Sequence, residues 1–305
     1  MSEDLDAQLI AALQQDGRAS YSELAARVGA PRTAVSARVQ ALLGSGAVEI
    51  VAVAHPQLLG LTSLAHVSVA VSGPADDVVE ALCATDASVF VSAVSGAYDL
   101  VAELRVSSAH ELYEALAGLR ALPRVRAVNT LLYTDVVTSV FMPQGPLRGD
   151  VRVDDTDRRL IELLERDGRM PYVELARRAG MSPSAARARV GRLVTSRALH
   201  VAAVVRRGTG GSGGSGRPAL GAGLNLGGDD AHVTGFLAAL PGVEFVARTV
   251  GRFDLVVTVG ADSTTRLHRV TERLKALDGV RGLTTWAHLE VFKEHYSRGV
   301  ARTSA

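Results

Sequence analysis

Apolar residues in the first fifty positions recur every three or four residues, which predicts short amphipathic helices. The predicted helices cover 4–16, 22–28 and 32–43. Gly29 ends the second helix and Pro31 starts the third, and this tight turn is typical of a helix-turn-helix. Alternating apolar positions over 47–54 predict a strand that follows the helices, so the segment is expected to be of the winged type.

Farther along the chain, the period shortens to two residues in several places. The predicted elements are strand 62–71, helix 75–84, strands 88–95 and 99–106, helix 108–119 and strand 125–135. Their order, βαββαβ, is that of a ferredoxin-like sandwich, in which helices cover one face of an antiparallel sheet. The predicted fold class is therefore α+β.

The whole arrangement occurs a second time. Residues 6–53 realign on 157–204 with a constant shift of 151, and the sequence GAYDLV from Gly96 meets GRFDLV from Gly251 at a shift of 155. A repeat that spans both parts of a unit indicates duplication of a whole module. The predicted elements of the second copy are helices 157–167, 173–179 and 183–196, strand 198–205, strand 219–226, helix 230–239, strands 243–250 and 254–260, helix 263–276 and strand 280–291.

The repeat and its linkers divide the chain into six segments. They are a helix-turn-helix domain (1–54), a ferredoxin-like domain (55–142), a linker (143–152), a second helix-turn-helix domain (153–205), a Gly/Ser-rich loop (206–218) and a second ferredoxin-like domain (219–305). The low-complexity loop is expected to be flexible, so that the second helix-turn-helix moves relative to the ferredoxin-like domain that follows it.

Charge distinguishes the two copies. The net charge of the chain is +1, yet residues 1–55 carry 4 arginines against 6 acids, whereas residues 151–207 carry 13 arginines against 7 acids. Arginine suits phosphates and guanine edges, and phosphate neutralisation supplies most non-specific affinity for DNA. We therefore expect the second helix-turn-helix to dominate DNA affinity. The alternative is that both helix-turn-helix segments contribute equally to DNA affinity, because the local placement of the arginines matters more than net charge.

Two sequence motifs, each present in both copies, resemble those of a known protein family. The phrase DGR-x4-ELA-x-R-x-G starts at Asp16 and again at Asp167, and G-x-[YF]-D-L starts at Gly96 and at Gly251. With the order of domains, they resemble the Lrp/AsnC (feast/famine) family of transcriptional regulators, over nearly the whole chain and twice. The resemblance implies a cytoplasmic homo-oligomer that binds double-stranded DNA and a small-molecule effector, expected to be an amino acid.

The residues expected to contact DNA lie on the third helix of each helix-turn-helix, because this helix enters the major groove. They are Arg32, Thr33, Ser36 and Arg38 in the first copy, and Ser182, Ser184, Arg187, Arg189 and Arg192 in the second. Ser182 is also able to cap its helix, which Pro31 cannot do. A solvated helix face is the alternative, and Arg38 and its equivalent Arg189 could instead pair with a neighbouring acid.

The resemblance further implies an effector site where each G-x-[YF]-D loop borders the last strand. The candidate residues are Gly96, Tyr98, Asp99, Thr130, Gly251, Arg252, Phe253, Asp254 and Thr285. The aspartates would hold a ligand ammonium, and backbone N–H groups its carboxylate. Since Arg252 stands where the first copy has Ala97, two such sites would differ in ligand. A simple hairpin turn is the alternative.

Other chemistries lack a sequence signal. No nucleophile elbow or phosphate loop occurs, the eight histidines lack metal-ligand spacing, and Cys83 is the single cysteine, so no catalytic residue, metal or cofactor is predicted. The first residues do not follow a signal-peptide pattern, and no apolar run is long enough to span a membrane. Sheet edges left over from the two ferredoxin-like domains are expected to pair chains into larger assemblies.

Two alternatives to a regulator remain. Sirohaem decarboxylases look like the same double architecture, but their Tyr-Asn-Leu stretch with a following histidine is replaced here by Tyr98-Asp99-Leu100 and Phe253-Asp254-Leu255, with no histidine shortly after. A metabolite-binding scaffold with a decayed first DNA-binding unit is the other alternative.

Overall fold

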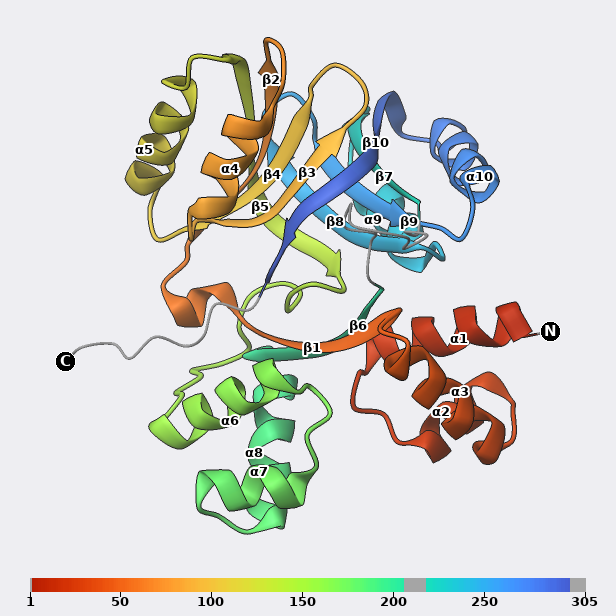
Figure 1. Ribbon diagram of the computed structural model, residues 1–305. Helices are drawn as coiled ribbons and strands as arrows, with labels where there is room; N and C mark the ends of the chain where they lie inside the picture. The colour runs from red at the N-terminus through yellow and green to blue at the C-terminus, as the bar shows by residue number, and fades with distance from the viewer. Residues whose placement is uncertain (1, 206–217, 297–305) are drawn as a thin grey trace. The chain divides into compact units, whose positions relative to one another are not determined.

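The computed structural model describes residues 2–205 and 218–296, which form two compact units (Figure 1). The first unit combines both helix-turn-helix segments, and the second combines both ferredoxin-like segments. The expected flexible loop at 206–218 lies outside the described residues, apart from Pro218.

The first unit contains all of the predicted helices and strands of the two helix-turn-helix copies. They are α1 (Ser2–Gln15), α2 (Tyr21–Val28), α3 (Arg32–Gly44) and β1 (Val48–Ala54) in the first copy, and α6 (Asp155–Arg166), α7 (Tyr172–Ala179), α8 (Pro183–Thr195) and β6 (Leu199–Val205) in the second. A short 3₁₀ helix that was not predicted, η1 (Pro56–Leu59), follows β1.

Local capping residues set the limits of these helices. Gly29 and Gly180 follow α2 and α7 in the left-handed conformation, with φ of 66° and 70°, which favours glycine. Ser182 accepts the backbone N–H of Ala185 at 3.2 Å and so caps α8. Pro31 provides no such bond to α3, which confirms the expected difference between the two third helices.

Each strand of the first unit packs against both copies. β1 and β6 form an antiparallel ribbon, on which α1 contacts β6 and α6 contacts β1. Ala203 of β6 therefore belongs to the core built around Leu9 and Leu13, whereas Ala52 and Ala54 of β1 belong to the core of the second copy. Since each helical core includes a strand from the other copy, the two copies fold as one body.

The second unit contains two βαββαβ segments, as predicted. The first comprises β2 (Ser63–Val71), α4 (Asp76–Ala84), β3 (Ser88–Val94), β4 (Leu100–Val106), α5 (Ala109–Arg120) and β5 (Val125–Ser139), and the second β7 (Ala219–Leu226), α9 (Ala231–Ala239), β8 (Val243–Val250), β9 (Leu255–Gly260), α10 (Thr264–Lys275) and β10 (Val280–Glu294). The strands form one closed ring in the order β10-β3-β4-β2-β5-β8-β9-β7.

Each half of this ring buries one sheet face under its own two helices. Val67 and Val69 of β2 share a core with Leu112 of α5, and Val257 of β9 shares the equivalent core with Leu267 of α10. Because side chains alternate along a strand, the residues between these positions face the other side of the sheet. That second face holds the polar residues discussed below.

One expectation about assembly is wrong. The described strands of the second unit leave no sheet edge for a second chain, because β5 pairs with β8 and β10 pairs with β3 within the same chain. The two junctions are equivalent: Tyr133 lies opposite Thr249, as His288 lies opposite Val94. Among the described helices, none has the length and apolar content needed to cross a bilayer.

Candidate DNA-binding and effector sites

The third helices carry the residues predicted to contact DNA. Arg32 and Thr33 are exposed in the first turn of α3, and Ser36 is half-buried one turn later. On α8, Ser184 and Arg187 are exposed, and the Ser184 hydroxyl lies 3.0 Å from the capping hydroxyl of Ser182. In the described structure, neither Arg32 nor Arg187 forms an ion pair, although the Arg187 guanidinium lies 5.7 Å from the centre of the Tyr172 ring.

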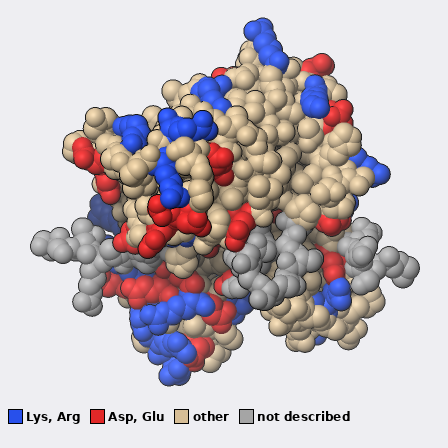
Figure 2. Space-filling view, turned by 45° about the horizontal axis from the view of Figure 1, so that its top comes forward, with Lys and Arg blue, Asp and Glu red and all other residues tan. Residues whose placement is uncertain are grey.

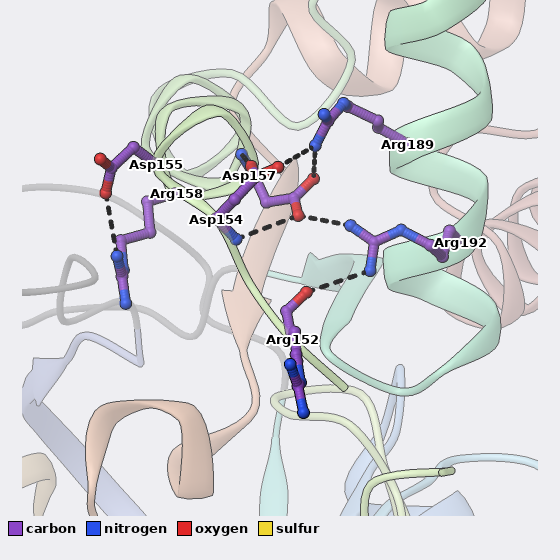
Figure 3. A network of polar contacts seen from close by, with 7 residues as sticks. All are labelled: Arg152, Asp154, Asp155, Asp157, Arg158, Arg189 and Arg192. Atoms are coloured by element: carbon purple, nitrogen blue, oxygen red, sulfur yellow. Dashed lines mark hydrogen bonds and ion pairs between the residues drawn. The ribbon is translucent and has the colours of Figure 1, made fainter. Parts of the chain in front are cut away.

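The other three arginines on these helices are held by acids. Arg38 forms a bidentate ion pair with Asp6 of α1. In the second copy, Arg189 Nη1 lies 2.7 Å from Asp154 and 2.9 Å from Asp157, and Arg192 pairs with the same Asp157 (Figure 3). The sequence left open whether Arg38 and Arg189 contact DNA or pair with an acid, and the structure shows the ion pairs. Contact of Arg38, Arg189 and Arg192 with DNA therefore stays a prediction.

These ion pairs fasten each third helix to its own first helix. The Asp157 side chain is 1% exposed and receives both arginines, whereas the Asp6 side chain is 19% exposed and receives one. The hydrogen bond from Arg189 holds the pKa of Asp154 below its usual range, because it favours the ionised carboxyl. The orientation of α8 therefore depends on a buried carboxylate, and that of α3 on a more exposed one.

Sequence reasoning missed a contact between the two copies, made by the arginine of each Asp-Gly-Arg turn. Arg18 Nη1 and Nη2 donate to the carbonyls of Gly168 and Met170 at 2.6 and 2.9 Å. Arg169 donates to the carbonyls of Gly17 and Ala19, both at 3.0 Å. We call this reciprocal contact the arginine clasp. The repeated motif was the available signal, but a turn motif does not reveal what its side chain contacts.

Aromatic rings complete the arginine clasp. The Arg18 guanidinium lies 4.5 Å from the centre of the Tyr172 ring, and that of Arg169 lies 5.5 Å from the centre of the equivalent Tyr21 ring. Such cation–π contacts add to hydrogen bonding where the guanidinium is partly desolvated. Each copy thus holds the other by the same set of contacts.

The surface charge follows the difference in composition. In Figure 2, blue side chains crowd the outer part of the lobe at the lower left, which corresponds to α6–α8, whereas the lobe of α1–α3 at the lower right is mostly uncharged in this view. On α7, Arg177 and Arg178 both pair with Glu174, so part of the positive charge of this segment is neutralised by ion pairs within the same helix.

The two loops predicted to bind an effector are tight hairpin turns. Gly96 has φ of 116° and Gly251 has φ of 147°, which other residues rarely adopt. Asp99 accepts the backbone N–H of Val71 at 2.7 Å, and Asp254 accepts that of Leu226 at 2.7 Å. Each aspartate is exposed yet already uses one carboxylate oxygen to hold the adjacent strand.

The loops do not form two separate sites. The Arg252 guanidinium from the second loop lies 4.7 Å from the centre of the Tyr98 ring in the first loop, and 4.5 Å from that of Phe253. A Cβ built at Gly251 would lie 3.2 Å from the carbonyl oxygen of Thr130, and one at Gly96 would lie 3.7 Å from that of Thr285. The structure therefore brings the candidate residues of both copies together in one region.

Polar residues that the sequence did not single out lie beside the loops. The ring of His66 on β2 lies 5.4 Å from the ring of Trp286 on β10. Burial, followed by the charge of Arg252, lowers the pKa of His66 to about 4, so the ring is neutral at pH 7. His66 Nε2, Trp286 Nε1 and Arg252 Nε are buried without a hydrogen-bond partner among the described residues.

Metal chemistry receives no positive support from side-chain placement. Within residues 2–205 and 218–296, no three His, Cys, Asp or Glu side chains lie together in an arrangement that could hold an ion. The Cys83 thiol is partly buried, and this burial raises its pKa. It therefore shows no sign of activation as a nucleophile.

Fold and site together describe a protein with two helix-turn-helix segments and two ferredoxin-like domains. Comparison with known families agrees: AsnC-type helix-turn-helix domains match residues 3–43 and 153–194, and Lrp/AsnC ligand-binding domains match residues 64–139 and 229–298. The chain belongs to the Lrp/AsnC family of transcriptional regulators, in a tandem duplicated form.

Individual relatives each match less than half of this chain. The HTH-type transcriptional regulator LrpA of Mycobacterium tuberculosis is 32% identical over 133 residues, which are 43% of this chain and 89% of LrpA. The regulator LysM of Saccharolobus solfataricus is 25% identical over 155 residues, 45% of this chain and 99% of LysM. Among solved structures, the siroheme decarboxylase NirDL matches 97% of this chain and 94% of its own, with a TM-score of 0.62 and 16% identity. That likeness shows a shared fold along the chain.

Proposed function

We propose that this regulator binds specific double-stranded DNA through α3 and α8, and that a small metabolite, an amino acid in the first instance, changes this binding. The observation that carries the proposal is the clasped first unit, which presents two third helices with Arg32 and Arg187 exposed and outside any described ion pair. An arginine in this position suits a phosphate or the O6/N7 edge of guanine.

DNA binding is tested by selecting genomic fragments with the purified full-length chain and measuring their affinity by fluorescence anisotropy. Specific fragments should bind more tightly than scrambled duplexes of equal length. The slope of log affinity against log salt should correspond to several phosphate contacts, at about 0.9 per contact. Equal affinity for specific and scrambled duplexes would contradict the proposal.

The effector part rests on the region shared by the two loops. Arg252 is the charged donor for a ligand carboxylate, and the buried Nε1–H of Trp286, which has no partner among the described residues, is a neutral candidate donor. The exposed carboxylates of Asp99 and Asp254 are the candidates for a ligand ammonium, each through the oxygen not used by its strand. A zwitterionic amino acid matches this pairing of opposite charges.

Calorimetry with individual amino acids tests this part. Removing a partly buried charged contact usually costs about 1.5–3 kcal/mol, or roughly ten- to a hundredfold in affinity, so Arg252→Gln should weaken binding by that amount. Asp99→Asn and Asp254→Asn should weaken it as well, while Arg120→Gln on α5 serves as the control. Trp286, as the single tryptophan, reports binding by fluorescence. Unchanged affinity in all three variants would place the ligand elsewhere.

Homo-oligomerisation is proposed through exposed apolar residues of the second unit. Leu132 and Val250 lie opposite each other across the β5–β8 junction and are 42% and 61% exposed, and Leu289 on β10 is 66% exposed. Exposed apolar residues of this kind often mark association surfaces. Light scattering should give a mass above one chain, and Leu289→Lys with Val250→Lys should reduce it. A monomeric wild type would contradict this proposal.

An enzyme is the second candidate, because NirDL shares the fold along the whole chain. The sequence lacks a histidine close after either loop, but the fold brings His66 beside Trp286 and within the electrostatic reach of Arg252. Adding an iron tetrapyrrole to the purified protein should leave its visible spectrum unchanged if the regulator alone is correct. A shifted absorption band, lost in His66→Gln, would support the enzyme.

A further inference from the structure

The ribbon of β1 and β6 relates the two helix-turn-helix copies by a pseudo-two-fold axis. Val51 lies opposite Ala202, which is its own equivalent at the repeat shift of 151. The pairs on either side match in the same way, since Val48 lies opposite Val205 and Ala54 lies opposite Leu199. A register in which a residue meets its own equivalent is the mark of a two-fold interface.

The arginine clasp obeys the same axis and fixes the two copies close to the ribbon. Arg18 and Arg169 each donate two hydrogen bonds to the equivalent turn of the other copy. A Cβ at Gly17 would lie 3.0 Å from the Ala202 backbone, and one at Gly168 would lie 2.7 Å from the Ile50 carbonyl oxygen. These turns therefore sit directly against the strands, and the two third helices are held in one relative placement.

The surfaces presented by this symmetric frame are not symmetric. The equivalent exposed or half-buried positions at the start of α3 and α8 are Pro31 and Ser182, Arg32 and Pro183, Thr33 and Ser184, and Ser36 and Arg187. Arg32 thus stands where the second copy has a residue without a donor. Arg187 stands where the first copy has a short hydroxyl.

Two helices related by a two-fold axis read half-sites of opposite orientation at a spacing set by the protein. A guanidinium reads guanine O6 and N7 strongly, whereas a serine hydroxyl discriminates little between bases. We infer that this chain recognises two unlike half-sites in inverted orientation at one fixed spacing, and that a single chain reads both. This inference rests on the proposed DNA binding and specifies its target.

Selection of duplexes from a random pool with the full-length protein tests the inference. The enriched motif should contain two different inverted half-sites at one spacing, and inserting about half a helical turn between them should weaken binding at least tenfold. A palindrome of identical half-sites, or a single half-site, would overturn the inference while leaving DNA binding intact. Absence of any enriched sequence would instead refute the proposed function.

Single substitutions assign the half-sites. Arg187→Ser places the first copy's residue on α8 and should lower affinity about tenfold for one half-site only, because one good arginine–guanine contact is lost. Arg32→Ala should affect the other half-site. Arg120→Ala on α5 is the control and should change neither. Loss at both half-sites from either variant would contradict the assignment.

A symmetrised variant gives the sharpest outcome. Pro31→Ser, Arg32→Pro and Ser36→Arg together give the start of α3 the residues of α8, except that Thr33 keeps its hydroxyl in place of that of Ser184, and leave the buried residues Val35 and Val39 unchanged. The variant should prefer a palindrome of the second half-site over the wild-type target by about tenfold or more. If circular dichroism shows a folding defect, the single Arg187→Ser variant still decides the question. Retention of the wild-type preference by a folded variant would overturn the inference.

Discussion

The two helix-turn-helix copies share their internal contacts and differ at their outer faces. Both have the arginine clasp, and both join the third helix to the first through an Asp–Arg ion pair at equivalent positions, Asp6–Arg38 and Asp157–Arg189. They differ in the residues that start α3 and α8 and in the net charge of the segment. The arginine clasp holds one copy to the other, so a change in the clasp residues of either copy alone disrupts it.

The arginines of the third helices have two roles, ion pairing within the domain and exposure at the surface, which amino-acid composition alone does not distinguish. Of the arginines on α8, Arg189 and Arg192 hold a buried carboxylate, and Arg187 remains outside any described ion pair. Ion pairs within the domain therefore neutralise part of the net positive charge of the second copy. The expected dominance of the second copy in DNA binding depends on fewer residues than the charge count indicates.

The largest effect is expected from the two aspartates. Asp157→Asn should lower the free energy of unfolding by about 3 kcal/mol, because it removes the charge of a buried partner of two arginines. Asp6→Asn should have a smaller effect, since Asp6 is more exposed and holds one arginine. Urea unfolding followed by circular dichroism measures both. Equal losses would show that the two ion pairs are equivalent in spite of their burial.

The DNA contribution of the two copies should be compared through Arg187 and Arg32. Each can be replaced by alanine without breaking a described ion pair, whereas replacing Arg189 or Arg192 would leave Asp157 short of a partner. Arg187→Ala should weaken binding about tenfold and Arg32→Ala less, and each should reduce the salt slope by about 0.9 if a phosphate contact is lost. Anisotropy at several salt concentrations measures this. Equal losses would contradict dominance of the second copy.

The sequence predicted the elements, their order and the duplication, because periodicity, caps and the repeat are local signals. It could not predict the clasp, because Arg18 contacts residues about 150 positions away. It left the role of Arg38 open for the same reason, since an arginine on a helix looks the same whether it meets DNA or an acid. The leftover sheet edges were wrongly expected because strand pairing between domains has no local signature. The convergence of the effector loops was missed likewise, because Tyr98 and Arg252 come from different copies.

Low pH should lower the stability of the fold through a buried histidine that only one copy has. His66 on β2 has Gly221 as its equivalent, and burial lowers its pKa to about 4. Since the folded chain binds this proton less well than the unfolded chain does, stability is complete above about pH 6.5 and falls toward pH 4. The loss is about 1.4 kcal/mol per pH unit.

Unfolding measured at pH 7 and 5.5 checks this dependence. His66→Gln should reduce the difference between the two pH values by about 1 kcal/mol, while His110→Gln on the exposed face of α5 should not. His200 on β6 also has a pKa lowered to about 4 by burial, so a smaller dependence should remain in His66→Gln. An unchanged difference in that variant would contradict a neutral, buried His66.

The smallest effect concerns the caps of the two third helices. Ser182→Ala should destabilise the first unit by about 1 kcal/mol, because the N–H of Ala185 loses its acceptor. Pro31→Ser should stabilise the first copy by about half as much, since α3 gains an acceptor but loses the restraint that proline places on the unfolded chain. The change in melting temperature of each variant, measured by thermal unfolding, shows whether the substitution stabilises or destabilises the protein. A stabilising Ser182→Ala, or a destabilising Pro31→Ser, would show that the difference in caps does not account for the stability of these helices.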